Sequence, residues 1–215
     1  MRIIAQAFGW RMDLNIVEWF TLFHERPVFA FAAFGFLDAA LALLAAMILV
    51  PYLRALFGKN RLLGASLLVA DGLAPLLLFW SNRSAELYII SRGYFRSHHF
   101  EEKLPFMDAG REVLRQLAEP ASAVNRLHGA ASALFFATGL TFAVLMFRPD
   151  RRHRLGAVGN GLALAYFPLL RLAPRYAFIP AALSAPFLAA WYFLLAAEIV
   201  RGAKEGSRER APRAK

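Results

Sequence analysis

Five long apolar segments are the feature that most limits how this chain can fold. They cover about residues 28–53, 62–80, 127–147, 155–174 and 176–200 of the 215 residues. Each is close to the ~20 residues that an α-helix needs to cross the hydrocarbon layer of a membrane. In lipid, every backbone N–H and C=O must be bonded within its own helix or within a closed barrel. The sequence therefore predicts an all-α fold, a polytopic transmembrane helical bundle with five spans.

Composition and charge support the same fold class. The chain is 59% hydrophobic and 19% charged, against about 25% charged residues in a typical soluble domain. A formal net charge of +10 on a soluble protein would suggest nucleic acid, but here Lys and Arg gather in short loops and at the C-terminal end. We therefore predict the lipid bilayer as the partner and no nucleic acid. The absence of cysteine excludes disulfides and thiol catalysis.

Three segments lie outside the transmembrane domain (28–200) or between its spans. They are an interfacial N-terminal helix (1–27), an outer helical segment (81–126) and a basic tail expected to be disordered (201–215). The N-terminal helix is amphipathic from Asp13 to Arg26, with Asp13 as its cap. We expect it to lie in the membrane interface, with Trp19 at headgroup level.

The distribution of basic residues predicts the orientation. Lys and Arg are dense in loops 54–61 and 148–154 and in the tail, and short loops rich in these residues stay on the cytoplasmic side. We therefore expect a multi-pass protein of the cell (inner) membrane, with the N-terminus outside and the C-terminus in the cytoplasm.

Two aspartates in otherwise apolar spans are the main candidate site residues. Asp38 lies about 15 Å below the outer edge of the first predicted span, and Asp71 lies near the middle of the second, at 1.5 Å per residue. Because these spans are joined by a short loop, we expect the carboxylates to share one layer near the midplane. Such a layer is typical of a proton relay or a cation site. Alternatively, each aspartate is protonated or hydrogen-bonded locally and only sets helix register.

Other polar residues are weaker candidates for the same intramembrane site. Pro75 has no N–H for the carbonyl of Asp71, which predicts a local opening of the helix. Arg171 is expected to extend outward or to reach Asp38, and Asn160 and Glu198 are expected to pair. Tyr166 lies near the midplane, and Trp191 and Tyr192 lie deeper than a belt of interfacial aromatics needs. Either they line a pocket or they pack.

No cofactor, metal or catalytic motif is predicted. The five histidines give no pair with helical ligand spacing deep in facing spans. The sequence contains no phosphate-binding loop, nucleophile elbow or HExxH motif, so catalytic residues stay unknown and we lean against an enzyme.

The C-terminal third, about residues 134–202, resembles an uncharacterised bacterial multi-pass membrane family of unknown function. The resemblance is carried by FRPDRRHRLGAVGN and by IPAALSAPFLAAWYFLLAAEIVRG. The N-terminal half departs from that family's pattern around Asp71. The resemblance implies a membrane protein and no activity.

Three classes of function stay open at this stage. The favoured class is a non-enzymatic accessory protein that binds a partner or an apolar ligand. The second is a small proton- or cation-coupled transporter that uses Asp38 and Asp71, and the third is a lipid-modifying membrane enzyme. Five spans in 215 residues also fit a homo-oligomer or a subunit of a larger membrane complex.

Overall fold

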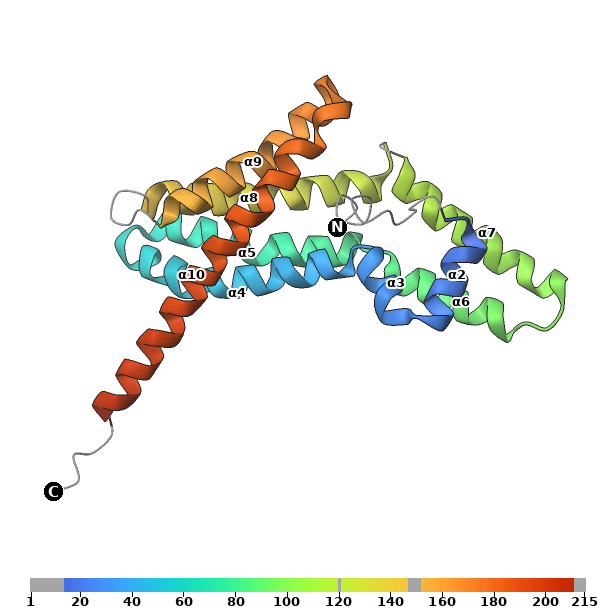
Figure 1. Ribbon diagram of the computed structural model, residues 1–215, viewed down its shortest axis with the longest axis horizontal. Helices are drawn as coiled ribbons and strands as arrows, with labels where there is room; N and C mark the ends of the chain where they lie inside the picture. The colour runs from blue at the N-terminus through green and yellow to red at the C-terminus, as the bar shows by residue number, and fades with distance from the viewer. Residues whose placement is uncertain (1–13, 120, 147–151, 211–215) are drawn as a thin grey trace. The chain divides into compact units, whose positions relative to one another are not determined.

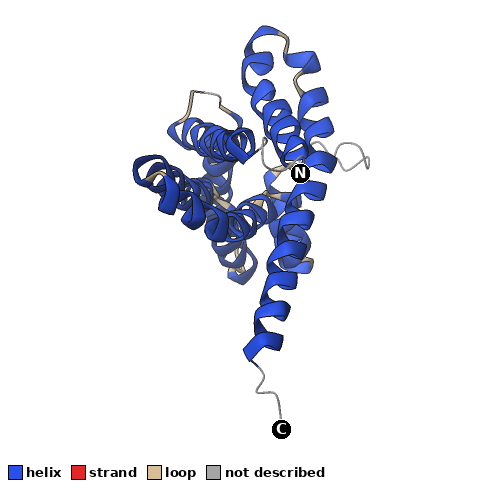
Figure 2. Ribbon diagram, turned by 90° about the vertical axis from the view of Figure 1, so that its left-hand side faces the viewer, coloured by secondary structure: helices blue, strands red, loops and turns tan. Residues whose placement is uncertain are grey.

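Helices account for the regular structure of this protein. The computed structural model describes residues 14–119, 121–146 and 152–210, and these residues form helices joined by short loops, with no strand among them (Figure 2). The prediction of an all-α fold is therefore confirmed.

Five helical stretches are long and apolar enough to cross a membrane. They are α4 (Phe36–Lys59), α5 and α6 together (Arg61–Ser81 and Ser84–Arg96), α8 (Ala123–Met146), α9 (His153–Leu172) and the run Pro174–Ala203, which joins η1 (Pro174–Tyr176) to most of α10 (Phe178–Arg210). Their mean hydropathy is 1.3 to 2.2, yet only 22–33% of the residues in each apolar window are buried. Large side chains such as Met47, Val69 and Phe193 are more than 60% exposed. An apolar surface of this extent belongs in lipid, so the chain is an integral membrane protein.

The described residues form two compact units. Unit 1 contains residues 14–44 and 72–134, and unit 2 contains residues 45–71 and 135–210, apart from the positions outside the description. Helices α4, α5 and α8 each contribute residues to both units. Each unit has a hydrophobic core of its own.

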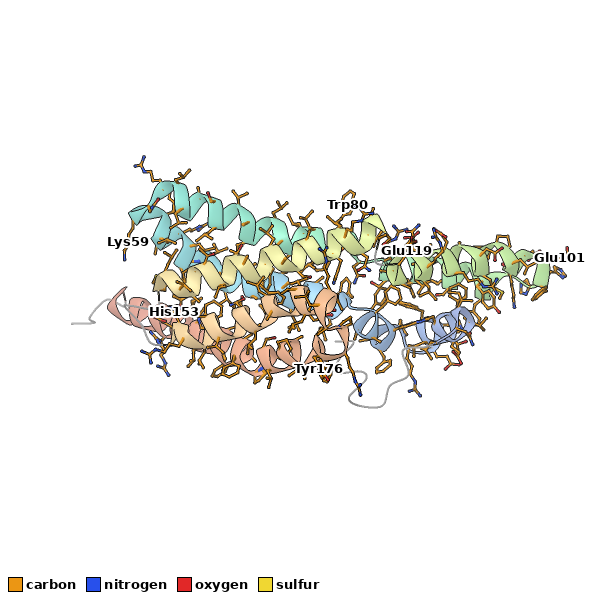
Figure 3. All side chains as sticks on the ribbon, turned by 90° about the horizontal axis from the view of Figure 1, so that it is seen from above. Lys59, Trp80, Glu101, Glu119, His153 and Tyr176 are labelled. Atoms are coloured by element: carbon orange, nitrogen blue, oxygen red, sulfur yellow. The ribbon has the colours of Figure 1, made fainter. Side chains whose placement is uncertain are left out.

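The core of unit 1 lies in a four-helix cluster made of α2 (Ile16–Glu25), α3 (Pro27–Ala33), α6 and α7 (Phe100–Ala118), which are neighbours in Figure 1. Buried side chains in it are mainly aromatic and aliphatic: Ile16, Trp19, Phe20, Phe23, Ala30, Leu87 and Val113. Figure 3 shows Glu101 and Glu119 at the two ends of α7, the long helix of this cluster.

Helix α2 confirms the predicted amphipathic helix but not its surroundings. The side chain of Asn15 caps it, accepting from the N–H groups of Val17 and Glu18, and Glu18 bonds back to the N–H of Asn15. The proposed cap Asp13 lies outside the described residues. The face of α2 that we expected to enter the headgroup layer packs on α6 and α7 instead, because these helices offer it an apolar surface. Trp19 is accordingly only 6% exposed.

The first predicted span, 28–53, is not one helix. Helix α3 ends at Ala33, Gly35 has a φ of 91°, and α4 begins at Phe36. A left-handed residue ends an α-helix, and glycine adopts this conformation without a steric penalty. The break was hidden in the sequence because the residues on both sides of it are apolar.

The core of unit 2 lies among α9, α10 and those parts of α4, α5 and α8 that belong to this unit. Its buried residues are Leu49, Leu53, Leu67, Phe142, Ala143, Trp191 and Leu195. Helices α9 and α10 form a hairpin through η1, and Figure 3 shows His153 and Tyr176 at opposite ends of it. Glycines allow the close approach: a Cβ at Gly156 would lie 2.4 Å from the Trp191 ring, and one at Gly159 would lie 2.9 Å from Leu188.

The expectation of a disordered tail from residue 201 is wrong as far as Arg210. Helix α10 continues to that residue. Ala, Lys, Glu and Arg make up most of this extension, and all four are good helix formers.

Candidate intramembrane site

Asp71 is the most unusual polar residue in the membrane-spanning helices. It lies in the middle of α5, which continues through Pro75, and the residue is 1% exposed. Neither carboxyl oxygen has a hydrogen-bond partner among the residues that the structure describes. A buried polar group without a partner costs about 1–3 kcal/mol, and a buried unpaired charge costs more. An ionised Asp71 without a partner would therefore be costly in this environment.

Tyr192 of α10 is the titratable neighbour of Asp71. Its phenol oxygen is buried and also has no hydrogen-bond partner in the described part of the chain. The Asp71 carboxylate acts electrostatically on this phenol. Leu67 and Leu68, one turn before Asp71 in α5, share a hydrophobic cluster with Tyr192. The Asp71 carboxyl, which accepts no hydrogen bond from the described residues, therefore lies near the Tyr192 hydroxyl, which donates none to them.

Asn160 of α9 is a third residue with a buried oxygen that has no partner among the described residues. Its Nδ2 donates to the carbonyl of Gly156 at 2.8 Å, and its Oδ1 accepts from no described group. A Cβ at Gly139 of α8 would lie 2.6 Å from this Oδ1. The Asn160 side chain therefore lies in the contact between α8 and α9. It fits there because residue 139 is a glycine and has no Cβ.

Two further sets of polar side chains in unit 2 have partners. Trp191 Nε1 donates to His153 Nδ1 at 3.3 Å, and both side chains are buried. Tyr52 of α4 donates to the Leu195 carbonyl at 3.0 Å and lies 3.2 Å from the Glu198 carboxylate. The predicted pairing of Asn160 with Glu198 is wrong, because Glu198 is held by Tyr52 and by Arg152, whose Nη1 lies 3.2 Å away.

Asp38 lies in unit 1, in the first turn of α4, rather than ten residues into a continuous helix. The break at Gly35 is the reason, and a Cβ at Gly35 would be 3.6 Å from Asp38 Oδ2. His128 acts electrostatically on Asp38, and His128 Nδ1 lies 3.1 Å from the Ser81 hydroxyl. Asp38 thus belongs to a polar group at helix ends. The shared layer of Asp38 and Asp71 stays a prediction.

Tyr166 and Arg171 of α9 do not join this group. Tyr166 is half-buried and packs edge-on against Phe167 at 5.5 Å between ring centroids. Arg171 is exposed in the last turn of the helix, which agrees with the outward orientation expected from the sequence.

Unit 1 also carries an apolar groove between α2 and α7. It has a volume of about 590 Å³ and is lined by Asn15, Ile16, Val17, Met107, Arg111, Leu114, Arg115 and Ala118. The two arginines of its rim are paired with acidic residues of the same helix, Arg111 with Asp108 and Arg115 with Glu112 and Glu119.

Comparison with protein-family models, with curated proteins and with solved structures found no match. The site must therefore be interpreted from its own chemistry. Three features of this region were not predicted from the sequence. They are the nearness of Tyr192 to Asp71, the His153–Trp191 hydrogen bond and the group formed by Tyr52, Glu198 and Arg152. The depth of Tyr192 in its span was the one signal for the first of these.

Proposed function

We propose that this integral membrane protein is a small proton-linked transporter or transporter subunit, in which Asp71 is the group that takes up and releases the proton. The observation that carries the proposal is the buried carboxyl of Asp71, whose two oxygens lack hydrogen-bond partners among the described residues. A carboxyl in this state ionises only when water, a cation or another donor reaches it. Ionisation of Asp71 is therefore coupled to the entry of water, a cation or a hydrogen-bond donor into its surroundings.

The alternative role of Asp71, as a helix-packing device, explains the observation less well. A packing device is favourable when its polar atoms are satisfied, since an orphaned buried group destabilises the contact that it makes. Asp38 fits a structural role better, because it lies at a helix start beside Gly35. The proposal accordingly uses Asp71 alone and not the pair of aspartates.

The basic loops support an orientation for this function. Lys and Arg in loops 54–61 and 148–154 and after residue 200 favour the cytoplasmic side for these segments. The N-terminus and the segment 81–126 would then be outside. We propose the cell (inner) membrane as the location.

An infrared titration tests the proposal directly. Protonated carboxyls in the purified protein are followed from pH 5 to pH 10, and the Asp71 band is identified by its loss in Asp71→Asn. The proposal expects a band that disappears reversibly as the pH rises. Asp38→Asn is the matched control and should leave that band in place. A band unchanged across the range, or no band lost in Asp71→Asn, would contradict a proton-carrying role.

A second candidate function, binding of an apolar ligand, is favoured by the groove between α2 and α7. Its volume lies within the range of small-molecule sites. Leu114→Trp should fill the groove, whereas Glu101→Gln at the far end of α7 should leave it open. Mass spectrometry of compounds co-purified with each variant checks this: loss of a bound compound only in Leu114→Trp supports the function. Equal content in both variants contradicts it.

A further inference from the structure

We propose that Tyr192 is the hydrogen-bond donor that Asp71 acquires on losing its proton, so that the two residues form a proton-operated contact between α5 and α10. This inference rests on the proposed function of Asp71 and deepens it. It names the partner of the carboxylate and the pair of helices whose contact the proton controls.

The two groups are complementary in hydrogen-bond chemistry. A neutral phenol has one O–H donor, and a carboxylate is an acceptor only. The Tyr192 hydroxyl and both Asp71 oxygens are buried and lack partners in the described residues. Both side chains belong to unit 2, and their helices meet in one hydrophobic cluster. Each is therefore the partner that the other lacks.

Three other side-chain donors in the described part of unit 2 are already engaged. Asn160 Nδ2 donates to Gly156, Trp191 Nε1 to His153, and the Tyr52 hydroxyl to Leu195. Moving any of them to Asp71 would break an existing bond. A bond from Tyr192 to Asp71 would break no existing hydrogen bond, because the Tyr192 hydroxyl has no partner among the described residues.

The proton balance of the step is simple. Asp71–COOH releases its proton to the aqueous phase and becomes a carboxylate, and Tyr192 keeps its own proton and shares it in the new bond. A hydrogen bond to an ionised group is roughly twice as strong as one between neutral groups. The bond is therefore expected in the deprotonated state and weak or absent in the protonated state. Tyr192 is the titratable group that the structure places in electrostatic reach of Asp71.

Trp191 gives the contact a spectroscopic reporter. Its ring lies against the Tyr192 ring, with centroids 4.9 Å apart, on the same helix. Rotation of Tyr192 toward Asp71 changes the surroundings of the Trp191 indole. In protein labelled with fluorotryptophan, the ¹⁹F resonance that is lost in Trp191→Phe should shift with pH, at the midpoint of the Asp71 infrared band.

The decisive variant is Tyr192→Phe, with Tyr166→Phe as the matched control on α9. Removing the donor destabilises the carboxylate, so Asp71 should keep its proton to higher pH, and the midpoint of its infrared band should rise by roughly one to two pH units. Tyr166→Phe should leave the midpoint unchanged. In Asp71→Asn, the pH-dependent shift of the Trp191 resonance should disappear.

The outcomes separate this inference from the proposed function. An Asp71 band that titrates at the same midpoint in Tyr192→Phe and in the unmodified protein would overturn the role of Tyr192 and leave proton binding at Asp71 intact. A Trp191 shift that persists in Asp71→Asn would also overturn it. The absence of a titrating Asp71 band in the unmodified protein would overturn the proposed function itself.

Discussion

Gly156 and Gly161 lie on the same helix, α9, but have different surroundings. A Cβ at Gly156 would come within 2.4 Å of the rigid indole of Trp191, whereas a Cβ at Gly161 would meet no atom within 4 Å. Small residues at helix contacts are what allows close packing in lipid. Gly156 is therefore required by the α9–α10 contact, and Gly161 is not.

We expect Gly156→Ala to destabilise the folded protein by about 1–3 kcal/mol, because overpacking forces the Trp191 side chain or the backbone to move. The matched variant Gly161→Ala should be neutral or slightly stabilising, since alanine favours the helix. Unfolding in a denaturing detergent measures both. Equal stability of the two variants would contradict the packing that we describe.

Glu112 on α7 has an ionisation that depends on its neighbours. Arg115 donates to its carboxylate through Nε and Nη2, both at 2.8 Å, and Gln116 donates at 2.8 Å. Hydrogen bonds from Arg115, then from Gln116, lower the pKa of Glu112 from 4.5 to about 2. A lowered pKa in the folded state means that this pair stabilises the fold above about pH 4.5. That contribution is lost as the pH falls through about 2.

Replacing Arg115 should return Glu112 toward ordinary behaviour. In Arg115→Ala, the carboxyl resonance of Glu112 should titrate closer to 4.5 than to 2 in a ¹³C NMR experiment. Arg111→Ala, which removes a cation paired with Asp108 rather than with Glu112, serves as the control and should not move it. A Glu112 midpoint that is the same in both variants would show that Arg115 is not the cause.

Residue patterns indicated Asp71 as a candidate site residue but did not indicate Tyr192 as its neighbour. A carboxyl in the middle of an apolar helix is visible in the sequence, because its position depends only on the bounds of one helix. The nearness of Tyr192 depends on how α5 and α10 pack, and no local pattern encodes that contact. Asp38 was placed too deep because a single left-handed residue, Gly35, resets the start of its helix.

At the scale of elements, helix α2 combines a strong local signal with a tertiary role. Asn15 and Glu18 form a capping box, and the opposite side of the helix supplies most of the buried aromatics of unit 1. Amphipathicity predicted the helix correctly. It did not distinguish an apolar face packed on lipid from one packed on α6 and α7, because both surfaces are apolar.

Loss of the cap should loosen α2 first. We expect Asn15→Ala to lower the stability of the four-helix cluster by about 1 kcal/mol, because two backbone N–H groups lose their acceptor. Asn15→Ser keeps an acceptor at the cap and should behave like the unmodified protein. Hydrogen exchange of the α2 amides is the measurement, and identical protection in both variants would argue against the capping role.

At the scale of the whole molecule, both units draw on the same helices. Helices α4, α5 and α8 are each divided between unit 1 and unit 2, so each unit is assembled from two separate pieces of chain. Hydropathy predicted the five spanning stretches because length and composition suffice for that. It gave no information on the division into units, which depends on contacts distant in sequence.

We expect insertion of α9 into the membrane to depend on α10. Helix α9 has the lowest mean hydropathy of the five stretches, 1.3, and carries the buried amide of Asn160. We expect a chain that ends after Leu172 to leave α9 outside the bilayer and a chain that ends after Ala203 to insert it. The protein has no cysteine, so Ala165→Cys gives a single probe. In inverted membrane vesicles, whose outer surface is the cytoplasmic face in the proposed orientation, a membrane-impermeant maleimide should label it only in the shorter chain, and equal labelling would contradict the prediction.

The glycines at the α9–α10 contact therefore bear on biogenesis as well as on packing. A segment of low hydropathy that enters lipid only when the following helix packs against its glycines cannot be integrated as it leaves the ribosome. It must wait until about thirty more residues have been made, at the length of α10. The order of membrane integration would then differ from the order of synthesis, and α10 would determine whether α9 enters the membrane.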